Sequence, residues 1–140
     1  MYSKILVAHD GSEHGWKALA AGLSVAAKFK GVVHCISVRE KLPVYAATVG
    51  EVMEASSEAK AFFDDLTARA QEEAEKAGVP LTVKILSGHE VQAILEYAKS
   101  GNFDLMVIGF MGLSHLYDRI WGSTSQNLVR LSPCTVIIVK

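Results

Sequence analysis

The 140-residue sequence lacks the features of several common protein classes. It has two cysteines, and because no histidine lies at short ligand spacing from either of them, they do not make a zinc site. Lys and Arg number 14 against 15 Asp and Glu, so the chain has no basic excess of the kind that nucleic-acid-binding proteins carry. We therefore expect neither a zinc module nor a nucleic-acid partner.

Long hydrophobic runs are absent as well. No segment approaches the roughly 20 consecutive apolar residues that cross a bilayer. The apolar run at residues 5–8 is too short for a signal-peptide core, so we expect a cytoplasmic protein with no membrane partner. Cys35 and Cys134 lie within apolar stretches, and we expect buried thiols at both positions rather than a disulfide or ligand role.

What the sequence does contain is an alternation of short apolar runs and longer helical patterns. Half of its residues are hydrophobic, enough to cover both faces of a sheet within one domain spanning residues 1–140. Such alternation predicts an α/β fold: an open, doubly wound, Rossmann-like parallel sheet of five strands with helices on both faces. The patterns predict strands at 4–9, 32–38, 81–86, 104–109 and 135–139, and helices at 13–29, 51–76, 89–100 and 123–131.

Two glycine turns are the strongest sign of a ligand site. In an open parallel sheet, ligands bind beyond the carboxyl ends of the strands. Gly109 and Gly112 follow a buried strand, and Gly122 precedes a helix that opens with Ser123 and Thr124. Backbone N–H groups at such turns and at a helix N-terminus attract phosphate. The same pattern also fits two plain turns and a capping serine, and the spacing alone does not separate the two interpretations.

Asp10, after the first strand, also has two interpretations. With Glu13 three residues later it resembles a capping pair for the first helix, and a carboxylate at a strand end can also accept hydrogen bonds from a sugar or base.

The weakly patterned stretch 39–52 reads as a connecting loop in preference to a mobile flap. No phosphate-binding G-x-x-x-x-G-K-[ST] loop, dinucleotide-binding G-x-G-x-x-G or nucleophile G-x-S-x-G motif is present.

Three segments together resemble a known family. Residues 5–13 read ILVAHDGSE, Gly109 and Gly112 are followed after nine residues by Gly122-Ser123, and residues 131–139 read LSPCTVIIV. In order and spacing these resemble the opening signature, the glycine motif and the terminal strand of the universal stress protein family, in its ATP-binding branch. The resemblance covers nearly the whole chain and implies the adenine nucleotide α-hydrolase-like version of the predicted fold.

The resemblance also implies a set of binding residues. Asp10 and the backbone at Ala8 would face the adenosine, Val38 would meet the adenine, and the residues around the glycine motif would line the path of the ribose and phosphates. It further implies a homodimer that pairs its last strands. The chain departs from the family pattern at Phe110, Met111 and His9, and these departures could narrow the pocket or favour AMP or another ligand over ATP. The implied set is Ala8, Asp10, Val38, Gly109, Gly112, Leu113, Ser114, His115, Gly122, Ser123, Thr124 and Ser125.

The expected function is therefore a regulatory stress-response module that binds ATP, ADP or AMP, with Mg²⁺ as a compatible partner of the phosphates. No catalytic residue or metal ligand is predicted, because the sequence shows no acid, base or metal constellation strong enough for fast hydrolysis. Slow Mg²⁺-dependent hydrolysis of ATP is compatible with the sequence. The alternatives are a ligand-free dimer that binds a protein partner, and a nucleotide hydrolase or transferase of the same fold.

Overall fold

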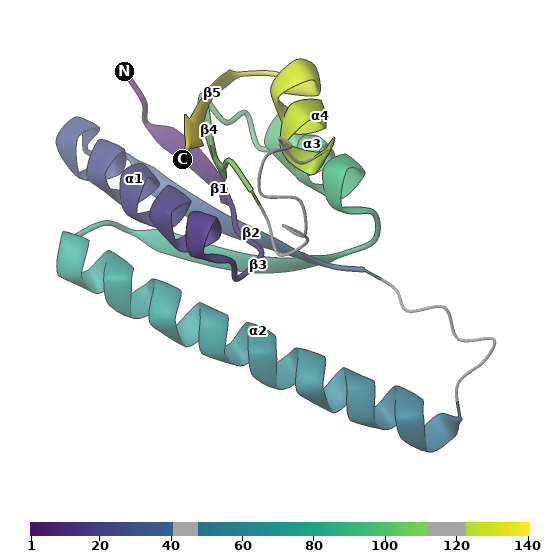
Figure 1. The fold of residues 1–140 in the computed structure, drawn as a ribbon. Helices are drawn as coiled ribbons and strands as arrows, with labels where there is room; N and C mark the ends of the chain where they lie inside the picture. The colour runs from purple at the N-terminus through teal and green to yellow at the C-terminus, as the bar shows by residue number, and fades with distance from the viewer. Residues whose placement is uncertain (41–47, 112–122) are drawn as a thin grey trace.

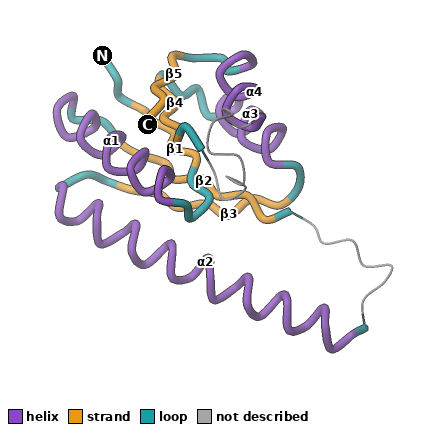
Figure 2. Tube along the Cα trace, in the orientation of Figure 1, coloured by secondary structure: helices purple, strands orange, loops and turns teal. Residues whose placement is uncertain are grey.

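A computed structural model of the chain describes residues 1–40, 48–111 and 123–140. Figure 1 shows a single sheet with helices on both faces, and Figure 2 shows the same elements along the Cα trace. The elements are β1 (Lys4–Ala8), α1 (Glu13–Phe29), β2 (Val32–Arg39), α2 (Val49–Ala77), β3 (Leu81–Ser87), α3 (Glu90–Ser100), β4 (Leu105–Gly109), α4 (Ser123–Leu131) and β5 (Thr135–Val139).

The sheet has five parallel strands in the order β3-β2-β1-β4-β5. The chain first builds outward from β1 through β2 to β3, then crosses back to place β4 on the other side of β1. The point where strand order reverses therefore lies between β1 and β4, where open α/β sheets bind their ligands. The predicted α/β fold is confirmed, and each strand and helix begins and ends within two residues of its predicted bounds.

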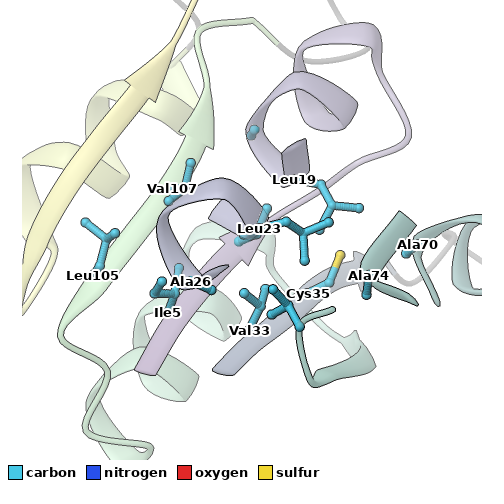
Figure 3. Close-up of a cluster of buried hydrophobic side chains, with 13 residues drawn as sticks. Ile5, Leu19, Leu23, Ala26, Val33, Cys35, Ala70, Ala74, Leu105 and Val107 are labelled. Atoms are coloured by element: carbon cyan, nitrogen blue, oxygen red, sulfur yellow. The ribbon is translucent and has the colours of Figure 1, made fainter. Parts of the chain in front are cut away.

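Two apolar clusters hold the helices to the sheet, one on each face. The first lies under α1 and α2 and contains Ile5, Leu19, Val33 and Ala70 (Figure 3). The second, which includes Met106 and Leu128, lies under α3 and α4. Strands covered on both faces are expected to be apolar throughout, and the three central residues of β1 are all buried.

Cys35 is fully buried in the first cluster, as predicted, and burial raises the pKa of its thiol to about 12. Cys134 is half-buried, because it lies just before the edge strand β5, so its prediction as a buried thiol was wrong. Both cysteines are free thiols. No helix among the described residues is long and apolar enough to span a bilayer.

The helix ends follow local sequence signals, with one difference from expectation. Ser12, not Asp10, is the N-cap of α1, and its hydroxyl accepts a hydrogen bond from the Gly15 N–H at 3.1 Å. Of the two interpretations of Asp10, the capping pair with Glu13 was therefore wrong. At the other end of the longest helix, Gly78 adopts the left-handed conformation that closes α2, as its position predicted.

Candidate functional site

A cleft lies at the point where strand order reverses, at the carboxyl ends of β1 and β4 and beside the first turn of α4. Polar and small residues predominate among those that line it, and a few are apolar. The described residues that line it are Ala8, His9, Asp10, Ser12, Gly15, Glu90, Ile108, Gly109, Met111, Ser123, Thr124, Ser125 and Leu128.

The turn after β1 is held in shape by its own side chains. The Asp10 carboxylate accepts a hydrogen bond from the Ser12 N–H at 3.0 Å, and Ser12 in turn caps α1. Because the two residues form consecutive bonds within one turn, the Asp10 carboxylate is fixed at the edge of the cleft.

His9 lies just behind this turn and is almost fully buried, with 3% of its surface exposed. Its Nδ1 accepts a hydrogen bond from the Gly11 N–H at 3.0 Å, so the proton of the neutral ring is on Nε2. Nε2 has no hydrogen-bond partner among the described residues. Burial lowers the pKa of His9 from 6.5 to about 4; Asp10 opposes this shift and Arg69 adds to it.

The His9 ring is fixed by its packing against α1. It lies edge-to-face on Trp16, with the ring centroids 4.2 Å apart, and the Arg69 guanidinium from α2 lies 3.8 Å from the Trp16 ring. A Cβ atom at Gly15 would lie 2.5 Å from His9 Nδ1, so only glycine lets α1 approach the ring this closely. His9 is thus a neutral structural residue that shapes the cleft at pH 7.

The end of β4 supplies the opposite side of the cleft. A Cβ atom at Gly109 would lie 2.8–2.9 Å from the Cβ and backbone of His14, so glycine is required here by the close approach of α1. Met111 lines the cleft, whereas Phe110 does not. The Lys140 ammonium group lies 5.5 Å from the Phe110 ring, and the Phe110 N–H donates to Val139. Of the two bulky residues after Gly109, Met111 is therefore the one that narrows the cleft.

The first turn of α4 brings three hydroxyl groups to the cleft. Ser123 is exposed, Thr124 is half-buried, and Ser125 is buried and donates its hydroxyl hydrogen to the Gly109 carbonyl at 2.9 Å. The Ser125 side chain thus joins α4 to β4, which leaves the Ser123 and Thr124 hydroxyls and the N–H groups of this turn to face a ligand. An anion is the group that such an arrangement favours.

Glu90 is a cleft residue that the sequence did not single out. It begins α3, on the side of the cleft where Asp10 lies. Burial and repulsion from Asp10 and Glu40 raise its pKa, and nearby His89 partly offsets them. Its position three residues after β3 was a signal, because strand ends meet at this edge of the sheet.

The predicted binding residues fall into three groups. Ala8, Asp10, Gly109 and the run 123–125 line the cleft together. Val38 lies near the end of β2 and is not among the residues that line it. The remaining predicted residues, Gly112, Leu113, Ser114, His115 and Gly122, lie outside the described residues.

Known proteins match this chain along its whole length. The model of the universal stress protein family matches residues 1–140. A universal stress protein from Bacillus subtilis, YxiE, is 31% identical, and the match covers 100% of both chains. The solved structure of universal stress protein UspA from Lactobacillus plantarum superposes with a TM-score of 0.85 at 26% identity, over 99% of this chain and 98% of that one.

Other solved structures show the same fold and hold nucleotides of their own. A universal stress protein in complex with cAMP has a TM-score of 0.73 at 23% identity, over 99% of this chain and 97% of that one. The universal stress protein from Archaeoglobus fulgidus in complex with dAMP has a TM-score of 0.67 at 18% identity, over 99% of this chain and 98% of that one. A universal stress protein family protein from Arabidopsis thaliana with AMP bound has a TM-score of 0.67 at 18% identity, over 99% of this chain and 91% of that one. By sequence and fold, this chain belongs to the universal stress protein family.

Proposed function

We propose that this protein binds an adenine nucleotide, ATP or AMP, in the cleft between β1, β4 and α4, and that it acts as a cytoplasmic regulatory module in a stress response. The observation that carries the proposal is the convergence of the first turn of α4 and the carboxyl ends of β1 and β4 on one polar cleft. Members of the fold that hold cAMP, dAMP and AMP support the ligand class. A single-domain organisation over residues 1–140 stays a prediction.

The roles of the residues follow from their chemistry. The N–H groups and hydroxyls of Ser123 and Thr124 would donate to phosphate oxygens, and the dipole of α4 favours the negative charge there. Asp10 would accept hydrogen bonds from the sugar or base, because a carboxylate cannot donate. No cluster of three or more potential metal ligands occurs among the described residues. Mg²⁺, if bound, would therefore be held mainly by the phosphates.

Thr124→Val is the sharpest single test of the phosphate assignment. It removes the hydroxyl while keeping the shape, so we expect AMP to bind about tenfold more weakly, as for the loss of one hydrogen bond to a charged group. Isothermal titration calorimetry measures the change. Thr67→Val is the matched control, because the Thr67 hydroxyl donates to the Phe63 carbonyl within α2, away from the cleft.

The ligand itself can be identified directly. Protein purified from cells, denatured and chromatographed, should release an adenine nucleotide. An empty protein whose melting temperature is unchanged by AMP or ATP would favour the ligand-free interaction module instead. Turnover of ATP with Mg²⁺ that disappears in Asp10→Ala would favour a hydrolase or transferase.

We also propose that two copies of the chain pair through β5. This strand is an edge of the sheet, and its four apolar residues are all partly exposed. An apolar edge strand with unpaired backbone groups is a template for pairing with another strand. The Val139 carbonyl points toward β4, because it accepts a hydrogen bond from the N–H of Phe110, the residue that follows β4. Because successive residues of a strand point their backbone groups to opposite sides, the N–H of Ile138 faces away from β4.

Ile138→Pro should therefore shift the protein from dimer to monomer in light scattering coupled to size exclusion, with the dissociation constant raised at least tenfold. The substitution removes an N–H that β4 does not use. Ile85→Pro is the control on the other edge: Ile85 is 38% exposed, and the Val33–Pro80 hydrogen bond gives its N–H the same outward direction. Circular dichroism checks that both variants fold. A dimer that survives Ile138→Pro would refute pairing through β5.

A further inference from the structure

The charge of the cleft is unevenly distributed. Each of the first three strands is followed by a carboxylate: Asp10 after β1, Glu40 after β2 and Glu90 after β3. The side formed by β4 and α4 carries glycine and hydroxyl groups and no charged side chain in its described part. Asp10 and Glu90 line the cleft and Glu40 does not, so the cleft has one acidic side and one neutral, hydrogen-bonding side.

The charged side chains among the described residues that line the cleft are all acidic. Asp10 and Glu90 are the two charged side chains among them, and no lysine or arginine is included. His9 does not offset them, because it is neutral at pH 7. A phosphate that enters this part of the cleft therefore meets donors on one side and like charge on the other.

Glu90 differs from Asp10 in how its charge is held. The Asp10 carboxylate accepts a hydrogen bond from the Ser12 N–H, which stabilises its negative charge. Among the described hydrogen bonds and ion pairs, none involves the Glu90 carboxylate, which is half-buried at the start of α3. The field of a half-buried charge is screened less by solvent than that of an exposed one. Glu90 therefore lines the cleft with a carboxylate whose charge solvent screens only in part.

We propose that Glu90 sets the charge preference of the cleft: it weakens binding in proportion to the negative charge of the phosphates, so that without divalent cations this protein prefers a monophosphate or cyclic monophosphate to a triphosphate. The inference rests on the proposed nucleotide-binding function and adds the selection among nucleotides. It assigns Glu90 a specificity role, since the donors of α4 attract every phosphate alike.

The size of the effect follows from the interaction of like charges. For two like charges separated by about one Debye length in a partly open site, one carboxylate weakens the binding of each added negative charge on the order of threefold at 0.1 M salt. Removing the charge of Glu90 should therefore help a highly charged nucleotide much more than a weakly charged one. A role in shape or packing alone would affect all nucleotides equally.

Glu90→Gln tests this, because it removes the charge and keeps the size of the side chain. Dissociation constants are measured by calorimetry at pH 8, with EDTA and 0.1 M salt, for cAMP, AMP and ATP, which carry about one, two and four negative charges. We expect affinity gains of threefold or less for cAMP, several-fold for AMP and tenfold or more for ATP. The gains should shrink at 1 M salt.

Glu96→Gln is the matched control, since it makes the same charge change on the exposed surface of α3, outside the residues that line the cleft. It should leave the order of the three affinities unchanged. Equal gains for all three nucleotides with Glu90→Gln, or no gain, would overturn the inference while the proposed function stands. Failure of the unsubstituted protein to bind any of the three would overturn the proposed function, and the inference with it.

Discussion

Replacing Gly109 with alanine is expected to lower the free energy of unfolding by about 3 kcal/mol. The added Cβ would lie 2.8 Å from the Cβ and 2.9 Å from the backbone of His14 in α1, a contact that no side-chain rotation relieves. Gly109 cannot move away, because it pairs with Val139 in the sheet and its carbonyl accepts the Ser125 hydroxyl. Urea denaturation followed by circular dichroism measures the loss.

Gly50→Ala is the control for this substitution. Gly50 lies in the first turn of α2, where an added Cβ would have no neighbour closer than 4.0 Å. Alanine favours a helix, so this variant should be as stable as the parent or more stable by up to about 1 kcal/mol. If Gly109→Ala unfolds at the same urea concentration as the parent, α1 does not approach β4 as closely as described.

Acidification is expected to destabilise the fold through His9. The unfolded chain takes up a proton on this histidine near pH 6.5, whereas the folded protein does so only near pH 4. The folded state therefore favours the neutral ring, and the stability that this contributes is fully present above pH 6.5. It is lost as the pH falls from 6.5 through 4, for a total of about 3 kcal/mol.

His9→Asn separates the contribution of His9 to the loss of stability at low pH from the contribution of the carboxylates. The asparagine Oδ1 can replace Nδ1 as the acceptor for the Gly11 N–H, and it does not titrate. Free energies of unfolding from urea titrations at pH 7, 5.5 and 4 should fall more steeply for the parent than for the variant. The difference between the two profiles is the contribution of His9. Parallel profiles would mean that His9 is not buried in its neutral form.

The elements of the fold could be read from the sequence because each carries its own local signal. The helix over 13–29 and the last strand over 135–139 were predicted to the residue, since periodicity and apolar runs are properties of neighbouring residues. The end of α2 at Gly78 was predicted for the same reason: a left-handed residue and a following proline act within a few positions. The N-cap of α1 was missed, because aspartate and serine both favour the N-cap position. Which of Asp10 and Ser12 takes it depends on where the backbone becomes helical.

The cleft could be predicted only in outline. Glycine and hydroxyl residues after β4 and at the start of α4 were signals in the sequence, and they do line one cleft with Asp10. Val38 was assigned from family resemblance, and it does not line the described cleft. Gly109 was predicted to let a ligand approach, but the structure shows that the backbone of α1 occupies the space beside it.

The sequence by itself determined the order of the strands and helices, their lengths and the family, because these depend on patterns repeated along the chain. Only the tertiary structure decided which strand ends meet. It brought Glu90 to the same cleft as Asp10 and placed α1 against Gly109. It also buried His9, which lowers the pKa of that ring to about 4. The physical reason is that charge interaction, burial and close packing depend on distances in space, and residues 80 positions apart in the chain become neighbours only when the sheet forms.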